Sequence, residues 1–274
     1  MANSIHVGTD PASLTDLSGA SYGVTLLKTA WPWMASPDAF LQNIPQRDGG
    51  SVLVNNFRMR AAAFPLRIAG TSNSDLLSKL ESIHKLTDPR LGAIYVKADV
   101  WSDRLFYGRF TGPWSAGYRG QLVINVAAEF TNQWSELLST TETTQTETVS
   151  ASPEAFTVPA AGSVAGSAPA LPQWVIKNTS GGASGAIKLT NGTTAETFSL
   201  PTTASIPNGT WLRLDRERWT VETSTDSGST WSDAPALVGT GKNIPRINPG
   251  VSNSCTLTNL SSGAIDIVYR ARYI

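Results

Sequence analysis

The chain has 274 residues, 15% of them charged, and its 21 basic residues are balanced by 21 acidic ones. Neither sign gathers into a block, so the sequence lacks the basic stripe that electrostatic nucleic-acid binding requires. Its single cysteine, Cys255, excludes an intramolecular disulfide and a cysteine-based metal centre, and we expect it to be a small buried residue. The N-terminus does not have the pattern of a signal peptide, and no apolar run reaches the ~18 residues of a membrane span. We therefore expect synthesis in a cytoplasm and no membrane partner.

Two domains are expected, because single domains cluster near ~100–150 residues. Residues 1–137 form the first. Its short apolar segments predict strands at 22–28, 50–60, 63–70, 92–101, 103–112 and 120–130. Residues 30–50 are rich in turn formers and predict a long irregular loop.

One amphipathic helix is predicted at residues 73–86. Its apolar residues recur at three- and four-residue steps, which places them on one face: Leu76, Leu77, Leu80, Ile83 and Leu86. Asn73 or Ser74 can cap the start, and Asp88 before Pro89 prevents continuation. His84 lies on the polar flank, and we expect an ordinary surface histidine.

Composition changes in residues 138–153, which are almost all Thr, Ser and Glu and predict an interdomain linker. The alternative is a Thr-rich edge strand. Residues 154–274 carry short strands at roughly 8–12-residue spacing, as in a sandwich. The last strand alternates cleanly, with Ile265, Ile267 and Tyr269 on its apolar side.

The stretch "STDSGSTW", residues 224–231, fits the spacing of the Asp-box turn of sialidases. Such a turn is local: a short polar side chain satisfies turn amides, glycine takes a positive φ and a tryptophan packs beneath. It occurs once here, and the second domain is too short for the repeated blades of a propeller. We interpret it as a structural turn.

A sialidase would also need an arginine cluster that grips a carboxylate. Arg213, Arg216 and Arg218 lie on one predicted strand and alternate with Asp215 and Glu217, as expected of a charged, solvated strand face. No other catalytic arrangement emerges.

Asp99 with Asp103, and Asp215 with Glu217, have the residue types of a glycosidase pair, but nothing in the sequence makes them face each other. We expect Arg104 and Arg216 to pair with them. The two histidines leave little for a Ser-His-Asp system, and His6 falls in an N-terminus expected to be mobile. No catalytic residue, metal or cofactor is expected, and the protein is predicted not to be an enzyme.

Three stretches carry a resemblance that spans most of the chain: "FPLRIAGTSNSDLLSKLESIHKLTDPRLG" (64–92), "VWSDRLFYGRFTG" (100–112) and "EAFTVPAAGSVAGSAPALPQWVIKN" (154–178). In these, the chain resembles the distal tail proteins of long-tailed (siphovirus-type) bacteriophages. The resemblance implies a mainly β fold, with an N-terminal split-barrel-like β domain that has one amphipathic helix, followed by a galectin-like β-sandwich. The Thr-rich segment and the Asp-box are departures from that family's pattern.

The resemblance further implies a ring of six copies, joined through the N-terminal domains at the distal end of the virion tail. The ring would join the tail tube to tail-tip hub or fibre proteins in the baseplate, and DNA would pass through it without specific binding. Phe106, Tyr107 and Phe110 are candidates for the subunit interface, with ordinary core as the alternative.

A second hypothesis is a carbohydrate-binding module that attaches to a host-surface glycan. Trp211 and Trp219 are predicted on one side of a strand, and Trp231 could join them across the hairpin. Exposed, they would form a saccharide platform; buried, they would be core.

Overall fold

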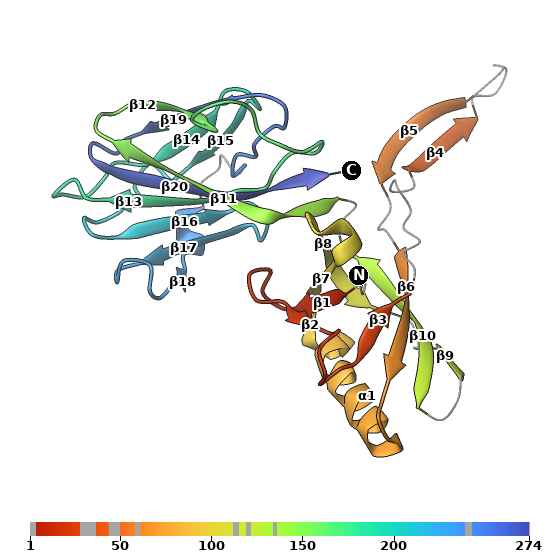
Figure 1. The fold of residues 1–274 in the computed structure, drawn as a ribbon. Coiled ribbons are helices and arrows are strands. Elements are labelled where there is room, and N and C mark those ends of the chain that lie inside the picture. Colours follow the sequence, from red (N-terminus) through yellow and green to blue (C-terminus); the bar gives the residue numbers. More distant parts are fainter. Residues whose placement is uncertain are drawn as a thin grey trace. The chain divides into compact units, whose positions relative to one another are not determined.

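The computed structural model describes residues 4–27, 37–43, 50–57, 61–111, 115–118, 122–133, 136–238 and 243–273; at 37–43, 50–57, 61 and 115–118 it describes the backbone only. The chain divides into two compact units, residues 1–140 and 141–273. Both are built from antiparallel strands, and α1 is the one α-helix among the described residues (Figure 1). The mainly β prediction is confirmed.

The first unit combines antiparallel strands with one helix. Its elements are β1 (Ile5–Gly8), β2 (Thr15–Asp16), β3 (Val24–Leu26), β4 (Pro37–Asn43), β5 (Gly50–Phe57), β6 (Ala61–Ala69), α1 (Asn73–Thr87), η1 (Pro89–Leu91), β7 (Ile94–Ala98), η2 (Asp99–Trp101), β8 (Arg104–Phe110), β9 (Ser115–Tyr118) and β10 (Val123–Asn132). Hydrogen bonding runs in the order β3-β6-β10-β8-β7-β1-β2, and β9 also pairs with β10. The core lies on one face because side chains alternate along each strand: Phe64, Leu66 and Ile68 of β6 are fully buried.

Close packing between two strands explains why residue 108, in the Tyr-Gly-Arg step of β8, is a glycine. A Cβ on Gly108 would lie 2.0 Å from the carbonyl oxygen of Thr131 on β10. The same contact region is held by Asn132, whose Oδ1 accepts from the Tyr107 amide at 2.8 Å, and by the Gln133 amide, which donates to the Tyr107 carbonyl at 2.7 Å. The two strands thus approach at a distance that only glycine allows.

Helix α1 begins at Asn73, the first residue of the predicted range, but neither predicted residue is its N-cap. Ser72 is the N-cap, and its hydroxyl accepts from the Asp75 amide at 3.1 Å. Leu76 and Ile83 are buried as predicted, whereas Leu77 is 62% exposed. His84 is an exposed surface residue, as expected.

Two predictions for the first unit were wrong. His6 is not in a mobile terminus, because β1 pairs with β7 and the ring Nε2 lies 2.9 Å from Asp99 Oδ1. Residues 30–50 do not form one irregular loop, because β4 pairs with β5 in a hairpin over seven register positions. The remaining residues of that segment, 30–36 and 44–49, lie outside the described residues.

The predicted linker at 138–153 is also wrong over most of its length, because β11 (Leu137–Val149) is a strand of 13 residues. Its first residues pair with β8, with Leu138 opposite Leu105, and its later part lies beside β20 in the second unit. Composition misled because threonine favours strands, and neighbouring strands supply backbone partners even though most side chains of the segment stay partly or fully exposed.

The second unit is a two-sheet sandwich, as predicted from its strand spacing. Its further elements are β12 (Glu154–Val158), β13 (Gln173–Asn178), β14 (Lys188–Asn191), β15 (Glu196–Ser199), β16 (Trp211–Asp215), β17 (Thr220–Ser224), β18 (Ser232–Asp233), η3 (Pro235–Leu237), β19 (Asn253–Thr258) and β20 (Gly263–Tyr273). One sheet has the order β18-β17-β16-β13-β20-β11 and the other β12-β19-β14-β15. Trp174 lies at 0% exposure in the core between them, and its Nε1 donates to the Pro245 carbonyl at 3.0 Å. Cys255 is buried, which raises the pKa of its thiol to about 12.

The predicted strand that held all three arginines is a hairpin. It turns after Asp215, whose Oδ1 accepts from the amides of Glu217 and Arg218 at 2.9 Å each. Trp219 follows at the end of that turn with φ +56°. The arginines therefore do not form one strand face, because an Asx-type turn interrupts the strand where the polar alternation suggested continuation.

Candidate functional surfaces

The aromatic residues predicted at a subunit interface lie at two different depths. Phe106 and Phe110 are 1% and 4% exposed, and both rings contact Phe64, at centroid distances of 6.5 and 6.2 Å. They are core residues, which is the alternative that the sequence left open, because the side of β8 that carries both rings faces the core. Tyr107 is partly exposed, and its ring lies 4.6 Å from that of Tyr95.

The three predicted platform tryptophans do not form one flat surface, since Trp219 lies in the turn after β16. Trp211 and Trp231 are partly buried and their rings are covered by cations: Lys177 Nζ lies 4.5 Å from the Trp211 centroid, and the Arg213 guanidinium 4.1 Å from that of Trp231. Partial burial therefore leaves less of each of these two rings exposed to a sugar than at Trp219.

Trp219 differs from the other two tryptophans. It is 57% exposed, and one face of its ring lies on the Arg216 guanidinium at 4.0 Å. The exposed ring is therefore held in place, which lowers the entropy lost when it contacts a ligand.

The Asp-box stretch forms the local turn that its sequence predicts. The Ser224 hydroxyl donates to Asp226 at 2.6 Å and accepts from the Gly228 amide at 2.8 Å, while Asp226 accepts from the amide and hydroxyl of Thr230 at 2.9 and 2.6 Å. The Ser224 hydroxyl and then Thr230 hold the pKa of the Asp226 carboxyl well below its usual range. Gly228 has φ +84°, and a Cβ there would lie 2.8 Å from the Trp211 ring. The hydrogen bonds of these side chains are therefore made within the turn itself.

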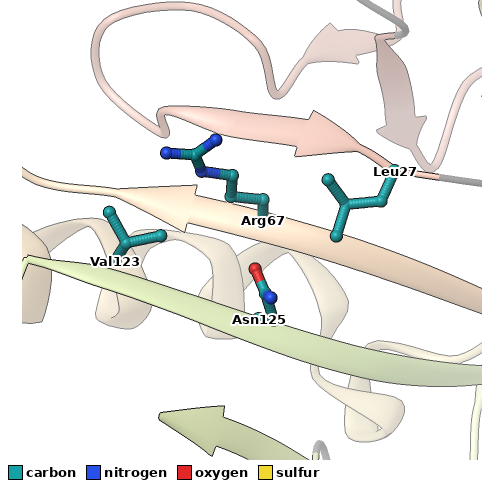
Figure 2. Close-up of a pocket in the computed structure, with 4 residues that line it drawn as sticks. All are labelled: Leu27, Arg67, Val123 and Asn125. Carbon is teal, nitrogen blue, oxygen red and sulfur yellow. The ribbon is translucent and has the colours of Figure 1, made fainter. Parts of the chain in front are cut away.

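A hollow on the outer face of the first unit's sheet was not anticipated from the sequence. It has a volume of about 250 Å³ and is lined by Leu27, Arg67, Val123 and Asn125, all on the same side of β3, β6 and β10 (Figure 2). Arg67 alternates with the buried Leu66 and Ile68, so it faces away from the core. A lone charge in an apolar strand is the only sequence signal of such a position.

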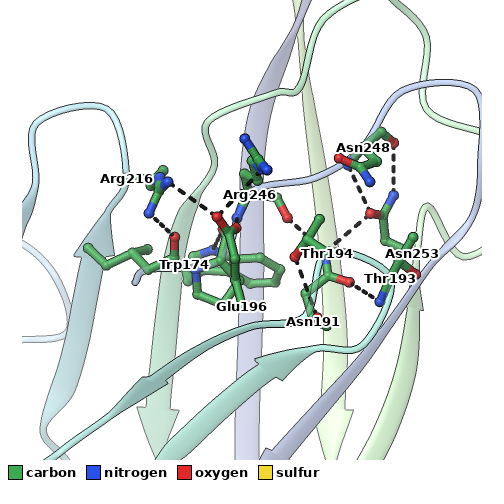
Figure 3. A network of polar contacts seen from close by, with 11 residues as sticks. Trp174, Asn191, Thr193, Thr194, Glu196, Arg216, Arg246, Asn248 and Asn253 are labelled. Carbon is green, nitrogen blue, oxygen red and sulfur yellow. Dashed lines mark hydrogen bonds and ion pairs between the residues drawn. The ribbon is translucent and has the colours of Figure 1, made fainter. Parts of the chain in front are cut away.

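A polar network at one end of the sandwich holds the segment after residue 242 (Figure 3). Glu196 accepts from the Arg246 amide at 2.8 Å and lies 3.4 Å from the Arg216 guanidinium, which donates to the Ile244 carbonyl at 2.8 Å. Nearby, Asn191 donates to the Arg246 carbonyl at 2.7 Å, and Asn253 donates to Asn248 at 3.0 Å. The sequence predicted that Arg216 pairs with Asp215 or Glu217, and this was wrong: its carboxylate partner is Glu196. The network is a structural clamp, since its side chains are satisfied within the unit.

Within the described ranges, no group of three or more His, Cys, Asp or Glu side chains is placed to hold a metal ion. Asp215 lies beside Glu217 as a turn-forming acceptor, and Asp103 pairs with Arg104. No helix in the described part of the chain is long and apolar enough to cross a membrane.

The fold is the one found in phage tail hub and baseplate proteins. The crystal structure of phage SPP1 Dit, described as a paradigm of the hub adsorption apparatus in phages that infect Gram-positive hosts, is similar with a TM-score of 0.72 and 14% identity, covering 98% of this chain and 99% of that one. A chain in the structure of the phage p2 baseplate in its activated conformation with Sr is similar with a TM-score of 0.58 and 8% identity, and the match covers 98% of this chain and 98% of that one. A chain in the corresponding structure with Ca is similar with a TM-score of 0.59 and 8% identity, and the match covers 100% of each chain.

No protein-family model and no curated protein sequence matches the chain. The resemblance to distal tail proteins is thus confirmed at the level of the fold.

Proposed function

We propose that this chain is a structural, non-enzymatic component of the distal end of a phage tail. One observation carries the proposal: the match to the hub protein SPP1 Dit covers both units, 98% of this chain. A match to one unit would indicate only a shared β-sandwich or a shared curved sheet. The order of the two units along the chain is the more specific feature, because β-sandwiches occur in many unrelated proteins.

The proposed assembly is a ring of six copies joined through the first unit. The hairpin β4–β5 supports a role in assembly, since it hydrogen-bonds to no other strand among the described residues. An isolated two-stranded hairpin is marginally stable in water, and its unpaired edges are templates for another chain. Tyr107 is a proposed interface residue, being partly exposed in the same unit.

In this proposal the ring joins the tail tube to tail-tip hub or fibre proteins, and DNA passes through its centre. The balance of 21 basic and 21 acidic residues suits a conduit that must not retain DNA. The location is the virion, and synthesis takes place in the host cytoplasm.

The test is the molar mass of the purified full chain by light scattering after size exclusion, alone and mixed with the tail tube protein of the same phage. We expect a mass near six times 29.1 kDa in at least one of the two samples. A monomer of 29.1 kDa in both would contradict the proposal.

A second function, binding of a host-surface glycan through the second unit, is favoured by Trp219, whose ring is exposed and held on Arg216. A ligand at a hundredfold excess over its dissociation constant stabilises the folded state by about 2.7 kcal/mol, which a thermal shift detects. The experiment is a glycan screen with the native chain and the Trp219→Ala variant. A shift present in the first and absent in the second would support this function, and no shift with any glycan would argue against it.

A further inference from the structure

Two of the large apolar side chains that the first unit exposes, Leu27 and Leu77, have an exposed charged residue beside them. The sheet patch consists of Leu27, Arg67, Val123 and Asn125, around the hollow in Figure 2. Leu27 is 46% exposed there. Arg67 is exposed beside it, and no hydrogen bond or ion pair joins its side chain to another described residue. The patch therefore combines the side chains of Leu27 and Val123 with one positive charge that no described residue pairs.

The helix patch consists of Leu77 and Glu81, one turn apart on α1. Leu77 is 62% exposed and Glu81 is exposed. Residues four apart on a helix lie on the same face, so the leucine and the carboxylate are neighbours. Within the part of the chain that the structure describes, Glu81 makes no ion pair. This patch combines a protruding apolar side chain with one negative charge.

The two patches lie on opposite sides of the unit. Arg67 points away from the core, whereas α1 packs its buried residues Leu76 and Ile83 on the core side of the sheet. Figure 2 agrees, with the helix behind the strands that carry the sheet-patch side chains. Two different patches on opposite sides cannot meet within one copy, but each can meet the other patch of a second copy. Repetition of such a head-to-tail contact closes into a ring when the rotation allows.

We propose that the helix patch of one copy docks on the sheet patch of the next copy. Leu77 enters the hollow beside Leu27, and the Glu81 carboxylate pairs with the Arg67 guanidinium. Each patch alone leaves a leucine exposed to water and a charge without a partner. Docking of the two patches buries the leucines and pairs the two charges. This inference rests on the proposed ring and names the surfaces that form it.

The test is a charge-reversal cycle on the full chain, with assembly measured by light scattering over a range of concentrations. Arg67→Glu and Glu81→Arg should each weaken assembly by about tenfold or more, because each places like charges opposite one another. The double variant should recover assembly to within about threefold of the native chain, because the pair is restored with its order exchanged. Leu77→Ser should weaken assembly without any change of charge.

Lys188→Glu is the matched control, since Lys188 is an exposed residue of β14 in the second unit and its reversal should leave assembly unchanged. Circular dichroism of each variant establishes that it is folded. If the native chain assembles and both single reversals assemble equally well, these surfaces are wrong while the ring stands. The same holds if both single variants fail and the double variant does not recover. If the native chain does not assemble, alone or with the tube protein, the ring and this contact both fail.

Discussion

Gly108→Ala should destabilise the first unit far more than an alanine substitution normally does. The new Cβ would lie 2.0 Å from the Thr131 carbonyl oxygen, whereas a carbon and an oxygen in close contact keep about 3.3 Å apart. Strands β8 and β10 must therefore separate by about 1.3 Å at this point. The hydrogen bond from the Gln133 amide to the Tyr107 carbonyl, now 2.7 Å, would lengthen to roughly 4 Å and be lost.

The neighbouring bond from the Tyr107 amide to Asn132 Oδ1, at 2.8 Å, would be strained by the same movement. Each buried group left without a partner costs about 1–3 kcal/mol, so the loss is roughly 2–6 kcal/mol. Alanine restricts the unfolded chain and recovers about 0.4–1 kcal/mol, which leaves a net loss of about 2–5 kcal/mol.

Calorimetry of the full chain measures this loss, and hydrogen exchange locates it in residues 104–110 and 123–132. Gly19→Ala is the matched control, because the nearest atom to its new Cβ is at 3.7 Å, an ordinary contact in the same unit. We expect the control to stay within about 0.5 kcal/mol of the native chain. Equal stability of the two variants would refute the close-approach argument for the Tyr-Gly-Arg step.

Three further predictions concern single side chains. Trp174→Phe should cost the second unit about 2–4 kcal/mol in urea unfolding, because the buried Pro245 carbonyl loses its donor and the core loses volume; no loss would contradict that role. Cys255, buried and with its pKa raised to about 12, should react with a thiol reagent only as fast as the second unit unfolds; immediate reaction in buffer would show that the unit is open. Arg90 lowers the pKa of Asp88 from 3.8 to about 2, so the stability from this pair is present above about pH 4 and is lost as pH falls through about 2. Asp88→Asn should therefore lower Tm at pH 7, with a difference that disappears near pH 2; a difference independent of pH would contradict the ion pair.

Local signals in the sequence were sufficient for α1, the sandwich strands and the Asp-box turn. The three- and four-residue spacing around Leu76 and Ile83 predicted the helix because that period follows from the geometry of one element. Ser224, Asp226 and Gly228 predicted the turn for the same reason: the hydrogen bonds join residues within eight positions of one another. Burial of Cys255 followed from its residue type.

Errors arose where a distant part of the chain supplies the stabilisation. Residues 138–149 have no apolar periodicity and became a strand, because β8 and β20 provide partners that composition does not reveal. The strand through Trp211 and Trp219 was predicted as continuous, since alternation of charge looks the same in a strand and in an Asx turn that is closed by Asp215.

The sequence by itself determined the mainly β class and the resemblance to distal tail proteins, because period, turn chemistry and order are properties of the chain. Only the tertiary structure decided which aromatic residues are core and which polar ones face outward. Phe106 and Tyr107 are neighbours of similar type, yet one is buried and the other partly exposed. Adjacent side chains of a strand point to opposite faces of the sheet, and which face is buried depends on pairings between strands far apart in sequence. The same pairings leave Arg67 and Leu27 on the outer face.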